Sequence, residues 1–421
     1  MPGHKGIGEI ERFDLTEIDG ADSLYSASGI IKESEENAGQ LFGANTFYST
    51  EGSSHSIRAM IYLTSLYAKE RGKKPLILAG RNAHKTFVGA TALLDVSVEW
   101  LVPENSSYLS CPVTARDIDE YFRKAKNLPT AVYLTSPDYL GNLSDVGEIA
   151  KVCHRHDVLL IVDNAHGAYL KFLPESLHPI ELGADMCSDS AHKTLPVLTG
   201  GAYLHISRSA PSLLVENAKN ALALFGSTSP SYLMLSSLDA ANRYISDGYA
   251  EKLSRFIKRL DEVKNELCSH GYTLFGDEPM KLTINAKSYG YLGRELAKYL
   301  LELDLVPEFY DPDFVVLMLT PEITDLELDR LKNALISLPK RDNILEQPPK
   351  IHLPSRAMSP REAITSASES VLIECALGRT LAAITVGCPP AVPIVISGEV
   401  IDEAAIKCFN YYGITECSVV K

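Results

Sequence analysis

Lys193 is the residue whose sequence setting most directly suggests chemistry. It lies in Cys187-Ser-Asp-Ser-Ala-His-Lys-Thr194, surrounded by a histidine and several hydroxyl residues. A switch from apolar to polar residues over 184–188 predicts a strand that leads into a loop containing Lys193. A lysine in buried surroundings can lose its proton near neutral pH and act as an amine nucleophile. Taken alone, the stretch is better explained as a loop with a solvated lysine.

Two other segments could hold a planar, phosphorylated cofactor. In Thr50-Glu-Gly-Ser-Ser54, at the start of a predicted helix, Ser53 and Ser54 would offer hydroxyls and free backbone N–H groups to a phosphate. In Arg81-Asn-Ala-His-Lys-Thr86, His84 could lay its imidazole against a ring. Each has an ordinary alternative, a helix N-cap for the serines and a loop position for the histidine.

Asp163 ends the apolar run of Leu159-Leu-Ile-Val-Asp-Asn-Ala-His-Gly167, so its charge would lie beside a buried sheet. An anion there needs a cationic partner, which a protonated pyridine nitrogen would supply; capping the next helix is the alternative role. Ala165 is small enough for a ring to lie close, and His166 follows it. A phosphate cradle, a stacking histidine, a buried aspartate and a lysine together match the requirements of pyridoxal 5′-phosphate.

The surrounding sequence predicts an α/β fold. Short apolar runs alternate with segments of helical periodicity, which predicts a mostly parallel sheet covered on both faces. Ligands of such sheets lie at the carboxyl ends of the strands. The expected strands are 75–79, 96–102, 131–136, 158–163, 184–188 and 202–207, with helices at 86–94, 114–126 and 146–156.

Four units are expected along the chain. Residues 1–270 would form a large cofactor-binding domain that is irregular over 1–45 and ends in an amphipathic helix over 247–270. Residues 271–338 would form a small α+β domain. The proline-rich stretch 339–360 is interpreted as a linker, and the C-terminal unit 361–421 as starting with a helix over 361–378.

Composition argues against several classes of function. The 421 residues carry a formal net charge of −14, which disfavours nucleic acid and anionic membranes as partners. The sequence has no run of about 18 apolar residues and no apolar signal-peptide core, so we expect a cytoplasmic protein. The eight cysteines have neither C-x-x-C pairs nor a close histidine cluster, which predicts buried free thiols and no metal site.

Four motifs resemble signatures of the ornithine/lysine/arginine decarboxylases, a family that depends on pyridoxal 5′-phosphate. They are Met1-Pro-Gly-His-Lys-Gly6, Asp163-Asn-Ala-His-Gly167, Ser190-Ala-His-Lys-Thr194 and Ser227-Thr-Ser-Pro-Ser-Tyr232. The resemblance spans nearly the whole chain. It implies the aspartate aminotransferase-like fold type I, decarboxylation of a basic L-amino acid in polyamine metabolism, and a homodimer or higher homo-oligomer with active sites at the subunit interface.

The resemblance also implies a role for each candidate residue. Lys193 would bind the cofactor aldehyde as a Schiff base, Asp163 would pair with the pyridine nitrogen, and His84 would stack on the ring. Lys193 or His192 would return a proton to the substrate carbon. Further cofactor contacts would come from Ser53, Ser54, Ala165, His166, Ser190, His192 and, from the neighbouring subunit, Thr228.

The chain departs from the family pattern at three positions. Asn164 replaces a commonly acidic residue, Cys388 stands where a tyrosine usually precedes the pair Pro389-Pro390, and Ala391 replaces a glycine. The Cys388 change bears on the substrate pocket more than on the cofactor. Because the chain starts at the Pro-Gly-His-Lys motif, we expect a short form without the N-terminal wing domain of larger members.

The sequence leaves the substrate open among basic amino acids, with arginine and lysine ahead of ornithine. Glu399 or Asp311 could read the distal substrate charge. A fold type I aminotransferase or aldolase is the main alternative, because Arg356 or Arg379 could clamp the carboxylate that a decarboxylase must release. A non-catalytic partner protein with this fold is a second alternative, but it predicts missing site residues, whereas the lysine, aspartate and histidine are all present.

Overall fold

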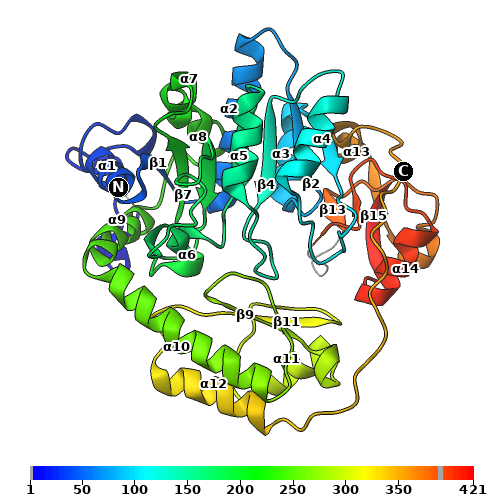
Figure 1. Cartoon of the computed structure of the whole chain (residues 1–421). Coiled ribbons are helices and arrows are strands. Elements are labelled where there is room, and N and C mark those ends of the chain that lie inside the picture. The colour runs from blue at the N-terminus through cyan, green and yellow to red at the C-terminus, as the bar shows by residue number, and fades with distance from the viewer. Residues whose placement is uncertain (1–2, 387–391) are drawn as a thin grey trace.

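A seven-stranded sheet forms the centre of the computed structural model, which describes residues 3–386 and 392–421 (Figure 1). The strand order is β1-β7-β6-β5-β4-β2-β3, and of these strands only β7 runs against its neighbours. This confirms the predicted mostly parallel sheet. The strands are β1 (Ala44–Ser49), β2 (Leu76–Gly80), β3 (Ser97–Leu101), β4 (Ala131–Thr135), β5 (Leu159–Asp163), β6 (Met186–Asp189) and β7 (Ala202–Ser207).

Helices cover both faces of this sheet, because its strands alternate their side chains between two apolar clusters. In β4, Ala131 and Tyr133 join the cluster formed with α2, α3 and α8, whereas Val132 and Leu134 join the cluster formed with α4 and α5. The helices of this domain are α1 (Ile30–Phe42), α2 (Ser53–Glu70), α3 (Lys85–Leu94), α4 (Ala115–Lys124), α5 (Val146–Arg155), α6 (Ala191–Thr194), α7 (Ser212–Glu216), α8 (Ala218–Phe225) and α9 (Tyr232–Ser246).

The long helix α10 (Tyr249–Ser269) leads from the large domain into a small α+β domain (Figure 1). Its apolar stripe, which includes Leu253, Leu260 and Val263, shares one buried cluster with Leu282 and Val315 of a four-stranded antiparallel sheet. Helix α12 packs beside α10. The elements are β8 (Leu274–Phe275), β9 (Lys281–Asn285), β10 (Phe309–Tyr310), β11 (Phe314–Met318), α11 (Gly293–Leu301) and α12 (Asp325–Ser337).

The C-terminal unit corrects one expectation, because the helix predicted over 361–378 ends early. Ser359 starts α13 (Pro360–Thr365) with a capping box to Glu362, and the helix stops at Ser366. The following residues form β12 (Ser368–Leu372), which pairs with β15 (Glu416–Val420). A distant partner strand therefore overrides local helical spacing. The unit also contains β13 (Thr385–Val386), β14 (Val395–Ile396) and α14 (Glu403–Tyr412).

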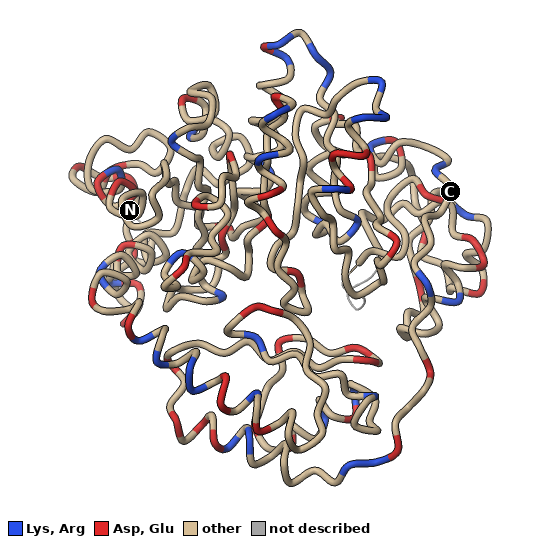
Figure 2. The backbone as a smooth tube through the Cα atoms, viewed as in Figure 1, with Lys and Arg blue, Asp and Glu red and all other residues tan. Residues whose placement is uncertain are grey.

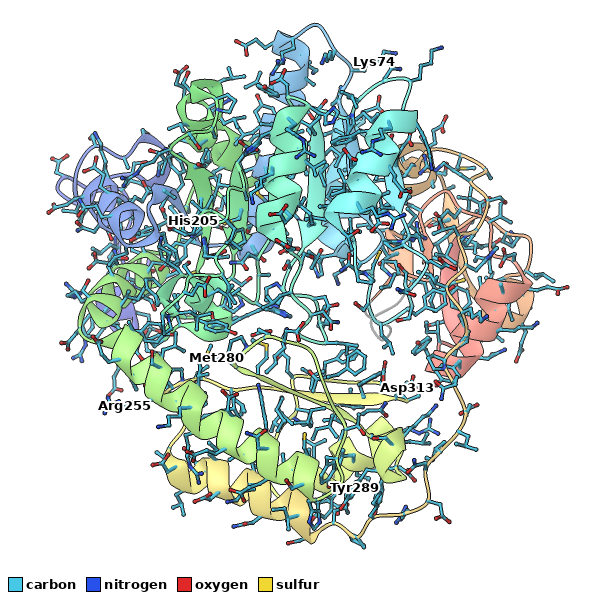
Figure 3. The ribbon with its side chains drawn as sticks, in the orientation of Figure 1. Lys74, His205, Arg255, Met280, Tyr289 and Asp313 are labelled. Carbon is cyan, nitrogen blue, oxygen red and sulfur yellow. The ribbon has the colours of Figure 1, made fainter. Side chains whose placement is uncertain are left out.

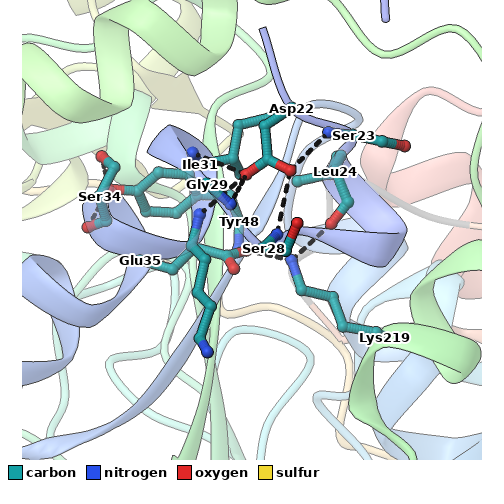
Figure 4. Close-up of polar contacts among 11 residues, drawn as sticks. Asp22, Ser23, Leu24, Ser28, Gly29, Ile31, Ser34, Glu35, Tyr48 and Lys219 are labelled. Atoms are coloured by element: carbon teal, nitrogen blue, oxygen red, sulfur yellow. Dashed lines mark hydrogen bonds and ion pairs between the residues drawn. The ribbon is translucent and has the colours of Figure 1, made fainter. Parts of the chain in front are cut away.

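The N-terminal segment is more ordered than the irregular structure predicted over 1–45, because it contains α1 and the start of β1. Asp22, with φ of 65°, closes the loop before α1 (Figure 4). A carboxylate at a helix N-terminus satisfies donors that have no partner within the helix. The Asp22 carboxylate accepts hydrogen bonds from the backbone N–H groups of Ser23, Ser28, Gly29, Ile31 and Lys32.

Acidic and basic side chains are interspersed along the chain, for example on α10 and α12 (Figure 2). Among the described residues, no helix has the length and apolar character needed to span a membrane. The prediction of buried thiols fails at Cys268 and Cys375, which are exposed, although the other described cysteines are buried. Cys388 and Ala391 lie outside the described residues.

Candidate active site

All of the residues predicted to act in catalysis or to bind the cofactor, except Thr228, line one cavity of about 460 Å³ at the carboxyl edge of the sheet. Asp163 is the last residue of β5, Lys193 lies in α6 just after β6, and His84 precedes α3. Thr385 and Pro393 complete the wall from the C-terminal unit. Segments that are far apart in the sequence thus meet in a single pocket.

Asp163 places a buried carboxylate in the wall of this cavity, with an exposed fraction of 3%. It accepts hydrogen bonds from the Tyr133 hydroxyl at 3.0 Å and from the Ala165 backbone N–H at 3.2 Å. Burial raises the pKa of Asp163, and the nearby His84 is the largest opposing influence. A carboxylate so placed favours a cationic ligand group. The site therefore fits the protonated pyridine nitrogen of the expected cofactor.

Lys193 lies in contact with a second predicted residue, His166. The Lys193 Nζ atom is 2.7 Å from Nε2 of His166. The other ring nitrogen of His166, Nδ1, is 2.9 Å from Nζ of Lys281 on β9. Burial, with the positive charge of Lys281 beside it, holds the pKa of His166 well below its ordinary value. The ring is consequently neutral at physiological pH.

His84 caps α3 while lining the cavity. Its Nδ1 accepts a hydrogen bond from the Thr86 backbone N–H at 3.3 Å and lies 3.0 Å from the Thr86 hydroxyl, so Nε2 carries the proton. Burial lowers the pKa of His84. His84 can therefore fill both roles considered for it. It is a histidine whose hydrogen bonds are satisfied locally, and its neutral ring can also lie against a planar ligand.

The N-terminus of α2 fits the phosphate that the sequence predicts there. Gly52, with φ of 75°, turns the chain into α2, and no side chain caps the helix. Ser190 donates a hydrogen bond to the Ser53 hydroxyl at 2.8 Å, and the Ser54 hydroxyl lies 3.0 Å from that of Thr86. Hydroxyls and free N–H groups at the positive end of a helix suit an anion.

His192 faces the same cavity beside Lys193. Its Nδ1 lies 3.0 Å from the Gly201 carbonyl oxygen. Because a carbonyl only accepts, Nδ1 carries the proton and Nε2 is the nitrogen that can take up another. The geometry therefore gives His192 the means to move a proton at Nε2.

Asn164, where the resemblance expects an acidic side chain, is bonded to a buried acid behind the site. Its Nδ2 donates to Oδ1 of Asp189 at 2.7 Å. The other Asp189 oxygen lies 2.9 Å from Nε2 of His178 and 3.3 Å from Nε2 of His205. Burial alone would raise the pKa of Asp189, but the two histidines hold it well below its usual range. His178, Asp189 and His205 each offer an atom of a kind that can bind a metal ion, and these atoms lie within 4.8 Å of one another. Nothing in the sequence indicated that these three residues lie together.

Thr228 is exposed in the loop before α9 and does not line the cavity. The neighbouring Ser227 backbone N–H donates to Glu51 at 2.5 Å, which fixes the loop near the start of α2. The contact expected between Thr228 and the cofactor of a neighbouring subunit stays a prediction.

Neither acid proposed to read the distal substrate charge lines the cavity. Glu399 forms a buried ion pair with Arg81, in which the guanidinium donates one hydrogen bond to each carboxylate oxygen, at 2.8 and 2.7 Å. Asp311 accepts the backbone N–H groups of Asp313 and Phe314, and burial raises its pKa to about 7. Both carboxylates have structural partners instead.

The two arginines that could serve as a carboxylate clamp lie elsewhere. Arg379 donates to Glu369 at 2.7 Å and to the Val420 carbonyl at 2.8 Å. Arg356 lines a separate small cavity beside Trp100. The geometry gives no support to the clamp on which the aminotransferase alternative depended.

Among the residues that sequence reasoning missed are Tyr133 and Lys281, which form hydrogen bonds with predicted site residues. Tyr133 places a hydroxyl between the apolar residues Val132 and Leu134 of β4, and this was the available signal. Lys281 is the first residue of β9, and nothing in the sequence indicates that the small domain meets His166.

The fold and the cavity define a fold type I enzyme. Residues 7–275 match the family model of the Orn/Lys/Arg decarboxylase major domain, and residues 343–418 match that of the C-terminal domain. The arginine decarboxylase of Halalkalibacterium halodurans is 30% identical over 96% of this chain and 88% of its own length. That of Bacillus subtilis is 29% identical over 97% of this chain and 88% of its own length.

Solved structures of similar fold include lysine decarboxylase A from Pseudomonas aeruginosa. Its TM-score is 0.80 at 18% identity, and the match covers 100% of this chain and 78% of that one. The constitutive lysine decarboxylase of E. coli gives 0.77 at 19% identity, covering 100% and 79%. The chain belongs to the Orn/Lys/Arg decarboxylase family, and it is a decarboxylase of basic amino acids.

Proposed function

We propose that this enzyme converts L-arginine to agmatine with pyridoxal 5′-phosphate bound in the cavity at Lys193. The observation that carries the proposal is the convergence of the Lys193 amine, the buried Asp163 carboxylate and the neutral His84 ring on one cavity. Arginine is favoured because relatives matching nearly the whole chain at 29–30% identity are named arginine decarboxylases. Lysine and ornithine are the alternative substrates.

The residues of the cavity would divide the binding of the cofactor among them. The N-terminus of α2, with Ser53, Ser54 and Ser190, would hold the phosphate, and His84 would support the ring. Asp163 would hold a proton at the ring nitrogen, because its buried charge is stabilised by a cation. When bound, the cofactor supplies an electron sink for the bond that breaks as carbon dioxide leaves.

The proton that replaces the carboxylate would come from Lys193 or from Nε2 of His192. Both side chains line the cavity on the same short helix. A positioned general acid is typically worth about 10²–10⁴ in rate. No arginine is among the described residues that line the cavity, which suits an enzyme that must expel the substrate carboxylate rather than hold it.

A second copy of the chain is proposed to complete the site. Among the described lining residues the carboxylates are Asp138 and Asp163, and Asp138 already accepts hydrogen bonds from Ser110 and Asn142. An acidic residue that binds the guanidinium of the substrate must therefore come from elsewhere, and the neighbouring subunit is the proposed source. The same subunit would also supply Thr228. Large apolar side chains exposed in the N-terminal segment support a homodimer, namely Ile7, Ile10, Phe13 and Ile18.

We place the reaction in polyamine metabolism in the cytoplasm, in agreement with the family resemblance and the acidic composition. The test is to supply purified enzyme and pyridoxal 5′-phosphate with arginine, lysine or ornithine and to measure carbon dioxide and amine together. Agmatine formed fastest from arginine is the expected result. Keto-acid formation without carbon dioxide would favour the aminotransferase, and a Lys193→Ala variant with normal activity would refute the proposal.

A further inference from the structure

Thr86 links two residues of the predicted cofactor site from behind the cavity wall. Its hydroxyl lies 3.0 Å from the Ser54 hydroxyl and 3.0 Å from Nδ1 of His84. Ser54 and His84 line the cavity, whereas Thr86 is not among the described lining residues and has an exposed fraction of 8%. Thr86 can therefore act on a ligand of the cavity only through these two side chains.

The packing of α2 against α3 holds these side chains together. Ser54 is in the first turn of α2, and Thr86 is in the first turn of α3. Ile57 of α2 and Phe87 of α3 belong to one buried apolar cluster, and the two helices lie side by side in the large domain (Figure 3). Because such clusters are closely packed, the two hydroxyls are held at hydrogen-bond distance before a ligand binds.

The chemistry of hydrogen bonding limits how the Thr86 hydroxyl is used. A hydroxyl has one proton to donate, and a neutral imidazole has one donor nitrogen and one acceptor nitrogen. Nδ1 of His84 accepts from the Thr86 backbone N–H, so it has no proton to donate to the Thr86 hydroxyl. The Thr86 hydroxyl thus has one proton for two acceptors, Nδ1 of His84 and the Ser54 oxygen.

A phosphate in the cavity would decide between these two acceptors. Phosphate oxygens are strong hydrogen-bond acceptors, so Ser54 binds a phosphate by donating its only proton to it. Ser54 then accepts at its own oxygen, and Thr86 is the donor at 3.0 Å. The Thr86 proton is thereby directed to Ser54, while Nδ1 of His84 keeps the Thr86 backbone N–H as its donor.

A second pair of hydroxyls at the start of α2 has the same order of donors. Ser190, the residue before α6, donates to the Ser53 oxygen at 2.8 Å, and the Ser53 hydroxyl keeps its own proton for a ligand. Ser190 is buried, with an exposed fraction of 1%. Hydroxyls from two different segments, Ser190 and Thr86, thus each support one serine of α2.

We infer that Thr86 is a positioning residue of the phosphate subsite, which directs the Ser54 hydroxyl so that it donates to the cofactor phosphate. The inference rests on the proposed binding of pyridoxal 5′-phosphate in this cavity. A hydroxyl that accepts a hydrogen bond becomes a stronger donor, because hydrogen bonds in a chain polarise one another. Thr86 therefore raises the affinity for a phosphate-bearing cofactor without touching the cofactor.

The test compares the affinity of apoenzyme for pyridoxal 5′-phosphate with its affinity for pyridoxal, each measured by absorbance titration. Thr86→Val removes the hydroxyl but nearly keeps the shape of the side chain. The ratio of the two affinities should fall by about fivefold to tenfold, since one hydrogen bond that supports the phosphate is lost. Thr86→Ala should lower the ratio in the same way, and Thr86→Ser should keep it close to the wild-type ratio.

The matched control is Thr91→Val on the same helix. The Thr91 hydroxyl is also buried and donates to the Val88 carbonyl at 3.0 Å, so its removal perturbs α3 without touching Ser54. This variant should keep the wild-type ratio of affinities. A general loosening of α3 would instead lower the affinities for both compounds by the same factor and leave the ratio unchanged.

A double-mutant cycle shows whether Thr86 acts through Ser54. In a Ser54→Ala background, Thr86→Val should leave the ratio where Ser54→Ala alone puts it. A folded Thr86→Val enzyme with the wild-type ratio, or a ratio that falls equally in both backgrounds, would overturn the inference while the proposed function stands. A wild-type enzyme that binds pyridoxal as tightly as its phosphate would show that the cavity lacks a phosphate subsite, and the proposed function would fail first.

Discussion

Replacing Glu399 with glutamine should destabilise the junction between the large domain and the C-terminal unit. The Glu399 carboxylate forms two short hydrogen bonds with the Arg81 guanidinium, and both side chains are buried, with exposed fractions of 5% and 1%. The same carboxylate accepts from the Ile396 backbone N–H at 2.9 Å. Arg81 also lies over the ring of Trp100, at 5.1 Å from its centroid.

The size of the effect follows from what each substitution leaves behind. In Glu399→Gln, the Arg81 charge stays buried without an anion, and breaking a buried pair in this way costs about 3–5 kcal/mol. Replacing both residues with methionine removes both charges and leaves mainly the Ile396 N–H without its acceptor, at about 1–3 kcal/mol. The double variant should therefore be more stable than Glu399→Gln alone.

Trp100 makes this prediction measurable, because it is the single tryptophan of the chain and lies against Arg81. Its fluorescence during urea unfolding reports the free energy of the junction. A loss below about 1 kcal/mol in Glu399→Gln, or a double variant no more stable than Glu399→Gln, would refute the reasoning. If Glu399 instead read the substrate, the variant would keep its stability and raise KM for arginine.

Three further perturbations should give defined results. Tyr133→Phe removes the hydroxyl that donates to Asp163, so cofactor affinity measured by absorbance titration should fall about tenfold, and an unchanged affinity would contradict the role given to Asp163. Ser54→Asp puts a negative charge at the start of α2, so phosphate-bearing cofactor should bind more weakly by about 2 kcal/mol or more, while pyridoxal without phosphate should be little affected. Burial would raise the pKa of Asp22, but hydrogen bonds from backbone N–H groups, among them those of Ser28 and Ser23, lower it to about 2. The contribution of Asp22 to stability is therefore complete above its ordinary pKa of 3.8 and is lost as the pH falls through about 2. In Asp22→Asn, the free energy of unfolding should lack this pH-dependent contribution. An identical acid-unfolding transition in the variant and the wild type would contradict the role given to the Asp22 carboxylate.

The sequence predicted the large-domain sheet because buried parallel strands are continuous apolar runs, and it predicted the site because polar residues follow those runs directly. Asp163 and Lys193 were found in this way. The reversed direction of β7 was not, since an apolar run carries no information about strand polarity. The start of α13 was correct but its length was wrong, because β12 depends on pairing with β15 at the end of the chain.

Long-range contacts account for the rest of what was missed. Lys281 reaches His166 across a domain boundary, and Glu399 meets Arg81 across most of the chain. Nothing local distinguishes a lysine that neutralises a buried acid from one that is solvated. The acids and arginines proposed for substrate recognition were chosen by charge alone, and the structure gives Glu399, Asp311 and Arg379 internal partners instead.

The central claim is that Lys193 carries the cofactor in this cavity. Reducing the cofactor-loaded enzyme with borohydride and locating the modified residue by peptide mass tests it most directly. The account predicts a single cofactor adduct on Lys193, which disappears in Lys193→Ala. An adduct on another lysine such as Lys85 or Lys281, with Lys193 unmodified, would contradict it.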